Sequence, residues 1–509
     1  MFSRVKGIGL FGIDSYMIEI EADVSNGLPA FDIVGLPDTA VKESRDRVRS
    51  AIKNCGYKFP VGKITVNLAP ADRKKEGSIY DVAVLLAILQ ASGQIKCDLS
   101  DSILIGEVAL DGKVRSVNGI LALTITAKEN GIKNIFVPFE NMNEAAVIDD
   151  INVYGVKNVK ELIAHLKGEE PLEIAQKPVL DKDLDGYYPD FSDVKGQIAA
   201  KKALEIAAAG HHNLLMVGPP GAGKSMLAKR LPSILPEMTF EESVETTKIH
   251  SIAGLLSQKN PFVFKRPFRS PHHTVSSAAI AGGGTVPKPG EISLAHNGVL
   301  FLDELPEFKR DVMEALRQPL EDGKVTVSRV AGSLTYPSSI MLIAAMNPCP
   351  CGFYGHPTKV CACSQAAVQK YLNKISGPML DRIDIHVEVP PVDFSALSSD
   401  KKEETSAQIR ERVNKARKIQ TERYKGTNIS CNARLTSPMI RKYCKMTDEA
   451  SKYLELSFER LGMSARAYDR ILKVARTVAD LEGAEIIEKS HIFTAISFRS
   501  LDSKYWTNR

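Results

Sequence analysis

The chain has 509 residues, of which 44% are apolar, so it is long enough for several domains and too apolar to be disordered. Its net charge of +5, from 66 basic and 61 acidic residues, permits a nucleic-acid partner without arguing for one. The longest apolar run lies near residues 82–89, which is too short to span a membrane, and the start of the chain lacks a signal-peptide core. Eight cysteines are scattered along the chain. We therefore expect a cytoplasmic protein with reduced thiols.

Residues 1–165 are expected to form a separate domain that mixes strands and helices. The expected strands are residues 13–24 and 63–70, and the expected helices are residues 39–56 and 78–93. The strand segments alternate apolar and polar residues, whereas Gly56 and Gly93 stand where the two helices should end. Residues 166–190 mix charge, proline and glycine without periodicity, which indicates a linker.

Residues 191–392 alternate helical segments with very apolar strands. These strands are NLLMVG at 213–218, GVLFLDE at 298–304 and SIMLIAAMNP at 339–348. Strands that are apolar on both faces predict an α/β domain with a central parallel sheet covered by helices. Residues 393–509 show no strand pattern and predict a helical lid, with helical segments at 401–425, 447–462 and 464–483.

The segment GPPGAGKS lies between an apolar strand and the helix MLAKRL, which is the setting of a phosphate-binding loop. Its glycines let backbone N–H groups close around phosphates, and the helix N-terminus adds positive potential. We expect Lys224 to contact the β- and γ-phosphates of ATP and Ser225 to bind Mg²⁺. The expected nucleotide-binding residues of the loop are Gly218, Pro219, Pro220, Gly221, Ala222, Gly223, Lys224 and Ser225.

Further polar residues follow the predicted strands. Asp303 is placed to hold the Mg²⁺ shell, and Glu304 is placed to polarise the attacking water. Asn347 ends the next strand and could hold that water, although it could also be a turn residue before Pro348. Two arginines could reach a γ-phosphate: Arg382, across a subunit boundary, and Arg466, from the start of a lid helix. A surface arginine and a helix salt bridge are the respective alternatives.

In this order, these motifs resemble the AAA+ family. Segments 266–284, 291–304 and 377–390 are similar to its magnesium-chelatase-like subgroup, called YifB or ComM, and the similarity covers nearly the whole chain. The resemblance implies that Asn347 is sensor 1, Arg382 is an arginine finger and Arg466 is sensor 2. It also implies a homo-hexameric ring that hydrolyses ATP and acts as a branch-migration helicase in recombination or natural transformation.

Residues 320–348 resemble the hairpin before sensor 1 in minichromosome-maintenance helicases. Segment 324–336 alternates like a β-hairpin, and we expect Lys324 and Arg329 near its tip, gripping the backbone of branched DNA. A neighbouring insert could add a second DNA loop through Lys265, Arg266, Arg269, His272 and His273. The alternative is that these cations only solvate a surface hairpin.

Segments 76–89 and 106–120 resemble the Lon-protease-like domain, which has a ribosomal-S5-like fold. The resemblance places the catalytic serine at Ile79 and the catalytic lysine at Leu123, with Ser78 one residue away and Lys128 further along. Without a base, a serine hydroxyl is a weak nucleophile. We therefore expect a domain without protease activity, serving as a DNA-binding or ring-forming platform.

The four cysteines Cys349, Cys351, Cys361 and Cys363 follow a C-x-C-x9-C-x-C pattern. This spacing suits a short knuckle around Zn²⁺, with His356 as a reserve ligand, and four reduced thiols in a loop are the alternative.

Three functions remain open on these motifs. A DNA motor is favoured over a protein-remodelling or chelatase motor subunit, because the chelatase motor lacks a Lon-like domain. An ATP-dependent protease is disfavoured by the missing serine–lysine pair.

Overall fold

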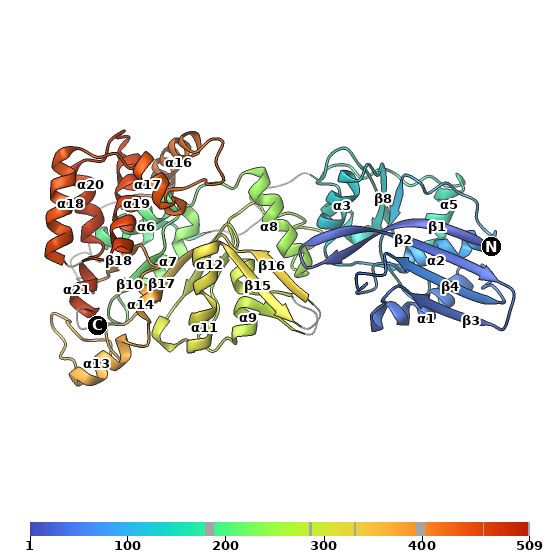
Figure 1. The fold of residues 1–509 in the computed structure, drawn as a ribbon, viewed down its shortest axis with the longest axis horizontal. Coiled ribbons are helices and arrows are strands. Elements are labelled where there is room, and N and C mark those ends of the chain that lie inside the picture. The colour runs from blue at the N-terminus through green and yellow to red at the C-terminus, as the bar shows by residue number, and fades with distance from the viewer. Residues whose placement is uncertain (179–187, 285–287, 330–331, 393–402, 462, 507–509) are drawn as a thin grey trace.

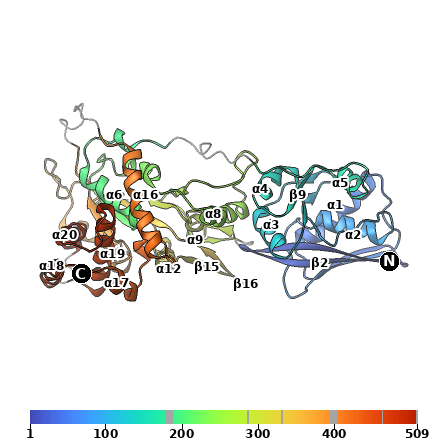
Figure 2. The same cartoon turned by 90° about the horizontal axis from the view of Figure 1, so that it is seen from above.

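The computed structural model describes the chain except residues 179–187, 285–287, 330–331, 393–402, 462 and 507–509. The molecule is elongated, with an N-terminal unit at one end, a central sheet domain in the middle and a bundle of C-terminal helices at the other end (Figure 1). The view from above shows the same order of the three parts (Figure 2). No helix among the described residues combines the length and apolarity that crossing a membrane requires.

The N-terminal unit is built on a four-stranded sheet of order β1-β2-β4-β3. Its strands and helices are β1 (Phe2–Phe11), β2 (Asp14–Ser25), β3 (Ala30–Val34), β4 (Lys63–Ala69), α1 (Thr39–Asn54) and α2 (Asp81–Ala91). In β2, Ile18 and Ile20 are buried while Glu19 between them is exposed, which is the alternation that predicted this strand. Nearly every side chain of α2 is buried, as its apolar sequence indicates.

A second, parallel sheet of order β5-β8-β9 completes this unit. Its strands, with the small hairpin and the helices beside them, are β5 (Ser102–Leu104), β6 (Glu107–Val108), β7 (Val114–Arg115), β8 (Asn134–Pro138), β9 (Asn152–Val156), α3 (Ile120–Glu129), α4 (Met142–Ala145) and α5 (Val159–Leu166).

The central domain is built on a five-stranded sheet of order β11-β14-β17-β10-β18, in which all neighbouring strands are parallel. These strands are β10 (Leu214–Val217), β11 (Phe268–Arg269), β14 (Val299–Leu302), β17 (Met341–Met346) and β18 (Ile385–Glu388). Every residue of β10, β14 and β17 is buried because helices cover both faces of the sheet. The predicted α/β domain is thereby confirmed.

The helices and small hairpins of this domain surround the sheet. They are α6 (Ile198–Gly210), α7 (Lys224–Arg230), α8 (Phe240–Ile252), α9 (Ser277–Ala281), α10 (Glu291–Leu294), α11 (Arg310–Ala315), α12 (Arg317–Asp322), α13 (Gln365–Leu372), α14 (Gly377–Leu380), β12 (Gly282–Gly283) with β13 (Lys288–Pro289), and β15 (Lys324–Arg329) with β16 (Gly332–Pro337).

The predicted helical lid is also confirmed, and no strand occurs among its described residues. Its helices are α16 (Ser406–Arg423), α17 (Ser437–Tyr443), α18 (Asp448–Leu461), α19 (Ala465–Glu482), α20 (Lys489–Ser497) and α21 (Ser500–Trp506). In α19 the apolar residues recur at helical spacing and face the buried cluster that the lid shares with α6.

The N-terminal unit contacts the central domain at two places, near α8 and at the β15–β16 hairpin. Leu121 and Val147 form a small buried cluster with Phe262, and the hydroxyl of Ser251 donates a hydrogen bond to the buried carboxylate of Glu144. The turn between β1 and β2 meets β16 so closely that a Cβ on Gly12 would lie 2.8 Å from Cδ2 of Leu334. The N-terminal unit therefore touches the hairpin directly.

Candidate nucleotide site

The phosphate loop leaves β10 at the carboxyl edge of the sheet and enters α7 at Lys224. Gly221 and Gly223 have φ angles of 78° and 90°, in the left-handed region that favours glycine. At Gly218 a Cβ would lie only 2.2 Å from the carbonyl oxygen of Val389, so no larger residue fits beside β18. These constraints explain the three glycines of the motif.

Lys224 links the loop to the end of the neighbouring strand. Its Nζ donates to the carbonyl oxygens of Gly218, at 2.7 Å, and of Pro219, at 2.9 Å. It also donates to Oδ1 of Asn347, at 3.1 Å, because β17 lies beside β10 in the sheet. Burial lowers the pKa of Lys224, whereas the charges of Asp303 and Glu304 raise it. A polyphosphate chain would supply the negative charge that this buried ammonium group lacks.

The opposite wall of the cavity comes from the end of β14. The hydroxyl of Ser225 donates to Oδ2 of Asp303 at 2.5 Å, so the structure brings together the two expected Mg²⁺ ligands. A hydroxyl and a carboxylate are hard oxygen donors of the kind that Mg²⁺ prefers, so these residues fit the ion. Glu304 follows in a left-handed conformation, with φ of 53°, and its N–H donates to Asp303. Together these residues, the loop and Asn347 line a cavity of about 340 Å³.

Sequence reasoning missed one residue of this cavity's surroundings. Nδ1 of His273 lies 3.4 Å from Oε2 of Glu304, and its ring packs edge-on against Phe308. The sequence predicts this histidine in a DNA loop, whereas the structure places it beside the expected catalytic glutamate. Two adjacent histidines after a serine and a proline could have marked a site residue in the sequence. The sequence alone does not identify Glu304 as the partner of His273, because the two residues are far apart in the chain.

Arg382 and Arg466 lie away from this cavity, at the amino edge of the sheet. Arg382 stands shortly before β18, and its carbonyl oxygen accepts a hydrogen bond from Asn213, the residue before β10. The amino and carboxyl ends of the strands are therefore separated by the length of β10, about 13 Å for four residues. Both arginines line a second cavity of about 260 Å³, which shares no lining residue with the first cavity in the part of the chain described here.

Both arginines have carboxylate partners at this second cavity. Nη1 of Arg382 donates to the carbonyl oxygen of Pro378 at 2.8 Å, and Nη2 pairs with Glu321. Nη1 of the exposed Arg466 lies 3.6 Å from Oδ2 of Asp381. Within one chain, neither arginine is placed at the phosphate loop.

The four predicted cysteines come together directly after Asn347. Their sulfur atoms all lie within 4.8 Å of one another, and Sγ of Cys349 lies 3.3 Å from Sγ of Cys351 and 3.7 Å from Sγ of Cys361. Four clustered thiols are a donor set that suits tetrahedral Zn²⁺. The loop also touches the phosphate loop, because a Cβ on Gly352 would lie 2.4 Å from Cδ of Pro220.

The predicted position of Lys324, one of the two expected DNA-binding cations, needs correction. Lys324 is exposed, but it pairs with Pro337 at the base of the hairpin and not near its tip. Arg329 ends β15 next to the turn, and its side chain lies outside the described residues. The prediction placed Lys324 wrongly because alternation identifies two strands without fixing where the turn between them falls.

Two cations of the second predicted loop, Arg266 and Arg269, are bound within the fold. Arg266 is buried, and its guanidinium donates to the carbonyl oxygens of Pro236 and Asn297 and pairs with Glu242. Arg269 makes two bonds of 2.7 Å to the carboxylate of Glu291. These cations stabilise the fold because their partners neutralise or solvate them.

In the N-terminal unit, the residues near the expected protease positions have other partners. Ser78 Oγ donates to the carboxylate of Glu107 at 2.5 Å, while Lys128 pairs with Asp150 at 3.0 Å. Leu123 is fully buried in α3, and Ile79 packs against the core. Ser78 is therefore hydrogen-bonded to a carboxylate, and Lys128 is paired with Asp150 instead.

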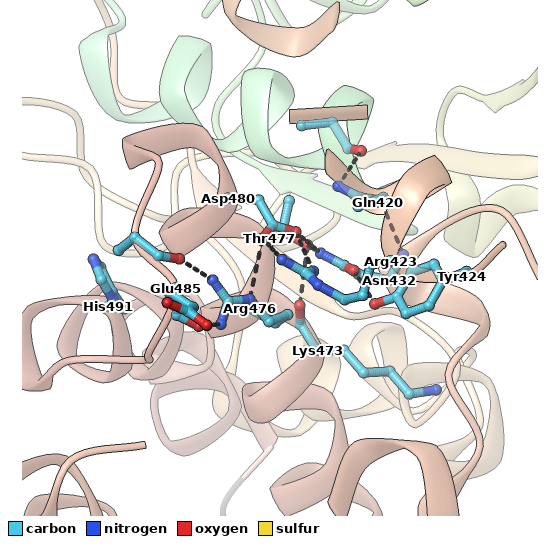
Figure 3. Close-up of polar contacts among 12 residues, drawn as sticks. Gln420, Arg423, Tyr424, Asn432, Lys473, Arg476, Thr477, Asp480, Glu485 and His491 are labelled. Atoms are coloured by element: carbon cyan, nitrogen blue, oxygen red, sulfur yellow. Dashed lines mark hydrogen bonds and ion pairs between the residues drawn. The ribbon is translucent and has the colours of Figure 1, made fainter. Parts of the chain in front are cut away.

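A buried polar network joins the helices of the lid to one another (Figure 3). It also reaches α6, because Nε2 of Gln420 donates to the carbonyl oxygen of Ala209. The carboxylate of Asp480 accepts hydrogen bonds from Arg423, at 2.5 and 2.9 Å, from Nε of Arg476, at 3.1 Å, and from Nδ2 of Asn432, at 2.8 Å. Asn432 also donates to Thr477, whose hydroxyl lies 2.7 Å from Nε2 of His212. The network thus extends from the lid's centre to the segment that precedes β10.

The chain is similar to known proteins over nearly its whole length. Three family models match it: subunit ChlI of Mg-chelatase at residues 20–141, magnesium chelatase subunit ChlI at 190–397, and the ChlI C-terminal region at 403–499. The competence protein ComM of Haemophilus influenzae is 44% identical over 497 residues, which cover 96% of each chain. YifB of Escherichia coli is 45% identical over 494 residues, also 96% of each chain. The magnesium-chelatase 67 kDa subunit of Chlorobaculum parvum is 28% identical over 162 residues, 31% of this chain and 23% of that protein.

Proposed function

Because the chain belongs to the magnesium-chelatase-like AAA+ family that includes ComM and YifB, we propose that it is a Mg²⁺-dependent ATPase that drives a DNA motor. The observation that carries the ATPase is the cavity in which Lys224 meets Asn347 and Ser225 meets Asp303. Lys224 binds the phosphates, Ser225 and Asp303 hold Mg²⁺, and Glu304 with Asn347 orients the attacking water. Mg²⁺, when bound, neutralises the charge that develops on the phosphate oxygens.

The ATPase test uses two variants of opposite effect. Lys224→Ala should weaken ATP binding, whereas Glu304→Gln should retain ATP and lose turnover by a factor of about 10² or more, because it removes the group that activates the water. Asp311→Asn serves as a control, since this exposed carboxylate lies on α11 outside the cavity. Undiminished turnover in Glu304→Gln would remove Glu304 from its role.

The placement of Arg382 supports a ring, which we propose to be a homo-hexamer. Arg382 lies at the edge of the sheet opposite its own phosphate loop, so it can complete a nucleotide site only on a neighbouring subunit. Arg382→Ala and Lys224→Ala subunits should therefore regain activity when mixed, because some interfaces would combine an intact loop with an intact arginine. Mixtures as inactive as either variant alone would contradict this arrangement.

The proposed substrate of the motor is branched DNA, as in branch migration during recombination or transformation. Two observations support it: the similarity to a protein named for competence, and a hairpin that directly precedes β17 in the chain, the strand before Asn347. Arg329→Ala should keep basal ATPase and lose strand movement on a synthetic four-way junction, because Arg329 lies next to the hairpin turn. Binding should weaken as salt rises, because phosphate contacts release counterions.

The alternative is a motor that remodels a protein or a chelatase partner, which the partial similarity to the magnesium-chelatase 67 kDa subunit favours. A wild-type protein that neither binds a four-way junction at low salt nor raises its ATPase with DNA would select this alternative. In either case we propose that the N-terminal unit is a platform without peptidase activity, because Ser78 bonds Glu107 and Lys128 bonds Asp150.

A further inference from the structure

The second cavity contains more positive charge than the two arginines assigned to ATP hydrolysis provide. Five cationic side chains line it, against the three carboxylates of Glu321, Asp381 and Asp384. The cations are Arg382, Arg434, Arg466, Arg470 and Lys473. His211, which also lines the cavity, stays neutral because burial and the charge of Arg434 hold its pKa well below its ordinary value. Five charges minus three leave an excess of +2 around a space of about 260 Å³.

Helix α19 presents three of these cations on one side. Arg466, Arg470 and Lys473 follow the i, i+4, i+7 spacing that brings side chains onto one helical face. The side chain of Arg466 is 69% exposed, that of Arg470 is 19% exposed, and Lys473 is half-buried. The helix therefore carries positive charge from the surface to the interior of the cavity.

Two of the cations, Arg434 and Lys473, form hydrogen bonds to neutral groups. Nη2 of Arg434 donates to the hydroxyl of Ser339 at 3.2 Å, and Nζ of Lys473 donates to the carbonyl oxygen of Ala433 at 3.1 Å. No carboxylate oxygen within the described ranges forms an ion pair with either one. Burial lowers the pKa of Lys473, the charge of Asp384 raises it, and the charge of Arg470 lowers it. A partly buried cation that forms no ion pair is costly, and a bound anion would reduce that cost.

The other cations are held in place, with hydrogen-bonding capacity left over. Asp384 is buried and accepts a bond of 2.7 Å from Nη1 of Arg470, while the N–H of Asn213 fixes its second oxygen at 3.1 Å. In the described structure, Nε of Arg470 and Nε of Arg382 are both buried without a hydrogen-bond partner. Such groups suit an acceptor with several oxygen atoms.

We propose that Arg434, Arg470 and Lys473 act with Arg382 and Arg466 as one pocket that receives the terminal phosphate of an ATP bound to a neighbouring subunit. The inference rests on the proposed ATPase and extends it, since it assigns three residues that the family motifs do not mark in this sequence. Lys473 and Arg434 are the phosphate-binding cations at the inner end of the pocket, and Asp384 is a positioning residue that orients Arg470. A DNA backbone phosphate is the other source of this chemistry, and the enclosed position beside Arg382 favours the nucleotide.

The test compares charge removal with charge retention at Arg434 and Lys473 in the full-length protein. Arg434→Gln and Lys473→Met should each lower DNA-free ATPase at least tenfold, and Arg434→Lys should recover part of the loss. Affinity for ADP, which lacks the γ-phosphate, should change less than twofold, and binding of a four-way junction should be unchanged. Arg441→Ala is the matched control, because this exposed arginine lies on the adjacent helix α17 outside the cavity.

Subunit mixing identifies which nucleotide the pocket serves. Arg434→Gln subunits mixed with Lys224→Ala subunits should exceed the summed activity of the two, because some interfaces pair an intact loop with an intact pocket. If the mixture only equals that sum, or if DNA binding is lost while DNA-free ATPase stays normal, the proposal is overturned. It also fails, with the ATPase itself intact, if Lys224→Ala and Arg382→Ala abolish turnover while Arg434→Gln and Lys473→Met keep the wild-type rate. A wild-type protein without ATPase would instead refute the underlying function.

Discussion

Replacing Asp480 by asparagine should loosen the lid more than any conservative change at its surface. The substitution keeps the shape of the side chain but removes the charge that pairs with Arg423 and Arg476. Asp480 and Arg476 are almost wholly inaccessible to water, at 0% and 1% side-chain exposure, so water cannot replace the lost partner. Breaking a buried ion pair on one side costs about 3–5 kcal/mol, because the remaining charge stays buried. The opening equilibrium of the lid should therefore shift by about 150- to 5000-fold, at 1.36 kcal/mol per factor of ten.

Hydrogen exchange measured on peptides from α19 of the full-length protein reads this shift directly, under conditions where exchange follows the opening equilibrium. Asn432→Ala leaves the ion pairs intact and should accelerate exchange less, since leaving a buried hydrogen-bond partner unsatisfied costs about 1–3 kcal/mol. Glu449→Gln, which removes an exposed ion pair with Lys489, is the control and should leave the rates unchanged. Acceleration of less than tenfold in Asp480→Asn, or a larger effect in Asn432→Ala, would refute the reasoning.

Three further predictions concern the cysteine cluster, its contact with the phosphate loop and the N-terminal unit. Anaerobically purified protein should contain one Zn²⁺ per chain, and substituting Cys349 and Cys361 by serine should abolish it, as measured by metal analysis; protein without zinc would refute the site. Gly352→Ala should weaken ATP binding at least fivefold, because its Cβ would meet Pro220, whereas Gly355→Ala, with a similar φ of 73° but open space around it, should not; equal effects would show backbone strain alone. Ser78→Ala should leave any trace of casein cleavage in the preparation unchanged, because its hydroxyl bonds Glu107, and cleavage lost in this variant would identify a protease.

The sequence was sufficient for the features that depend on local patterns. The strand–loop–helix around Lys224 and the apolar strands before Asp303 and Asn347 follow from residue types a few positions apart, so the parallel sheet was predictable. The partners of Arg266 were not, since Pro236, Glu242 and Asn297 reach it from distant segments. A basic residue in a sequence is a candidate for DNA until its neighbours in space are known.

The same reason explains why only some of the cations that line the second cavity could be predicted from the sequence. Arg470 and Lys473 continue the spacing of Arg466 along α19, so helical periodicity could have identified them. Arg434 belongs to a separate turn of the chain, and only the packed lid brings it to this helix. The position of a cation along the chain does not tell which other cations will lie beside it in the folded protein.

Because the β1–β2 turn rests directly on β16, any movement of the hairpin affects its contact with the N-terminal unit. The two surfaces meet at Gly12 and Leu334 with no room for another side chain between them. A hairpin that shifts during ATP turnover must either carry the whole N-terminal unit with it or separate from it and expose Leu334, at a cost of about 2 kcal/mol. In the first case the N-terminal unit moves with the hairpin in each cycle, and its far end moves further than the hairpin does. In the second case the contact between Gly12 and Leu334 breaks and re-forms once per cycle.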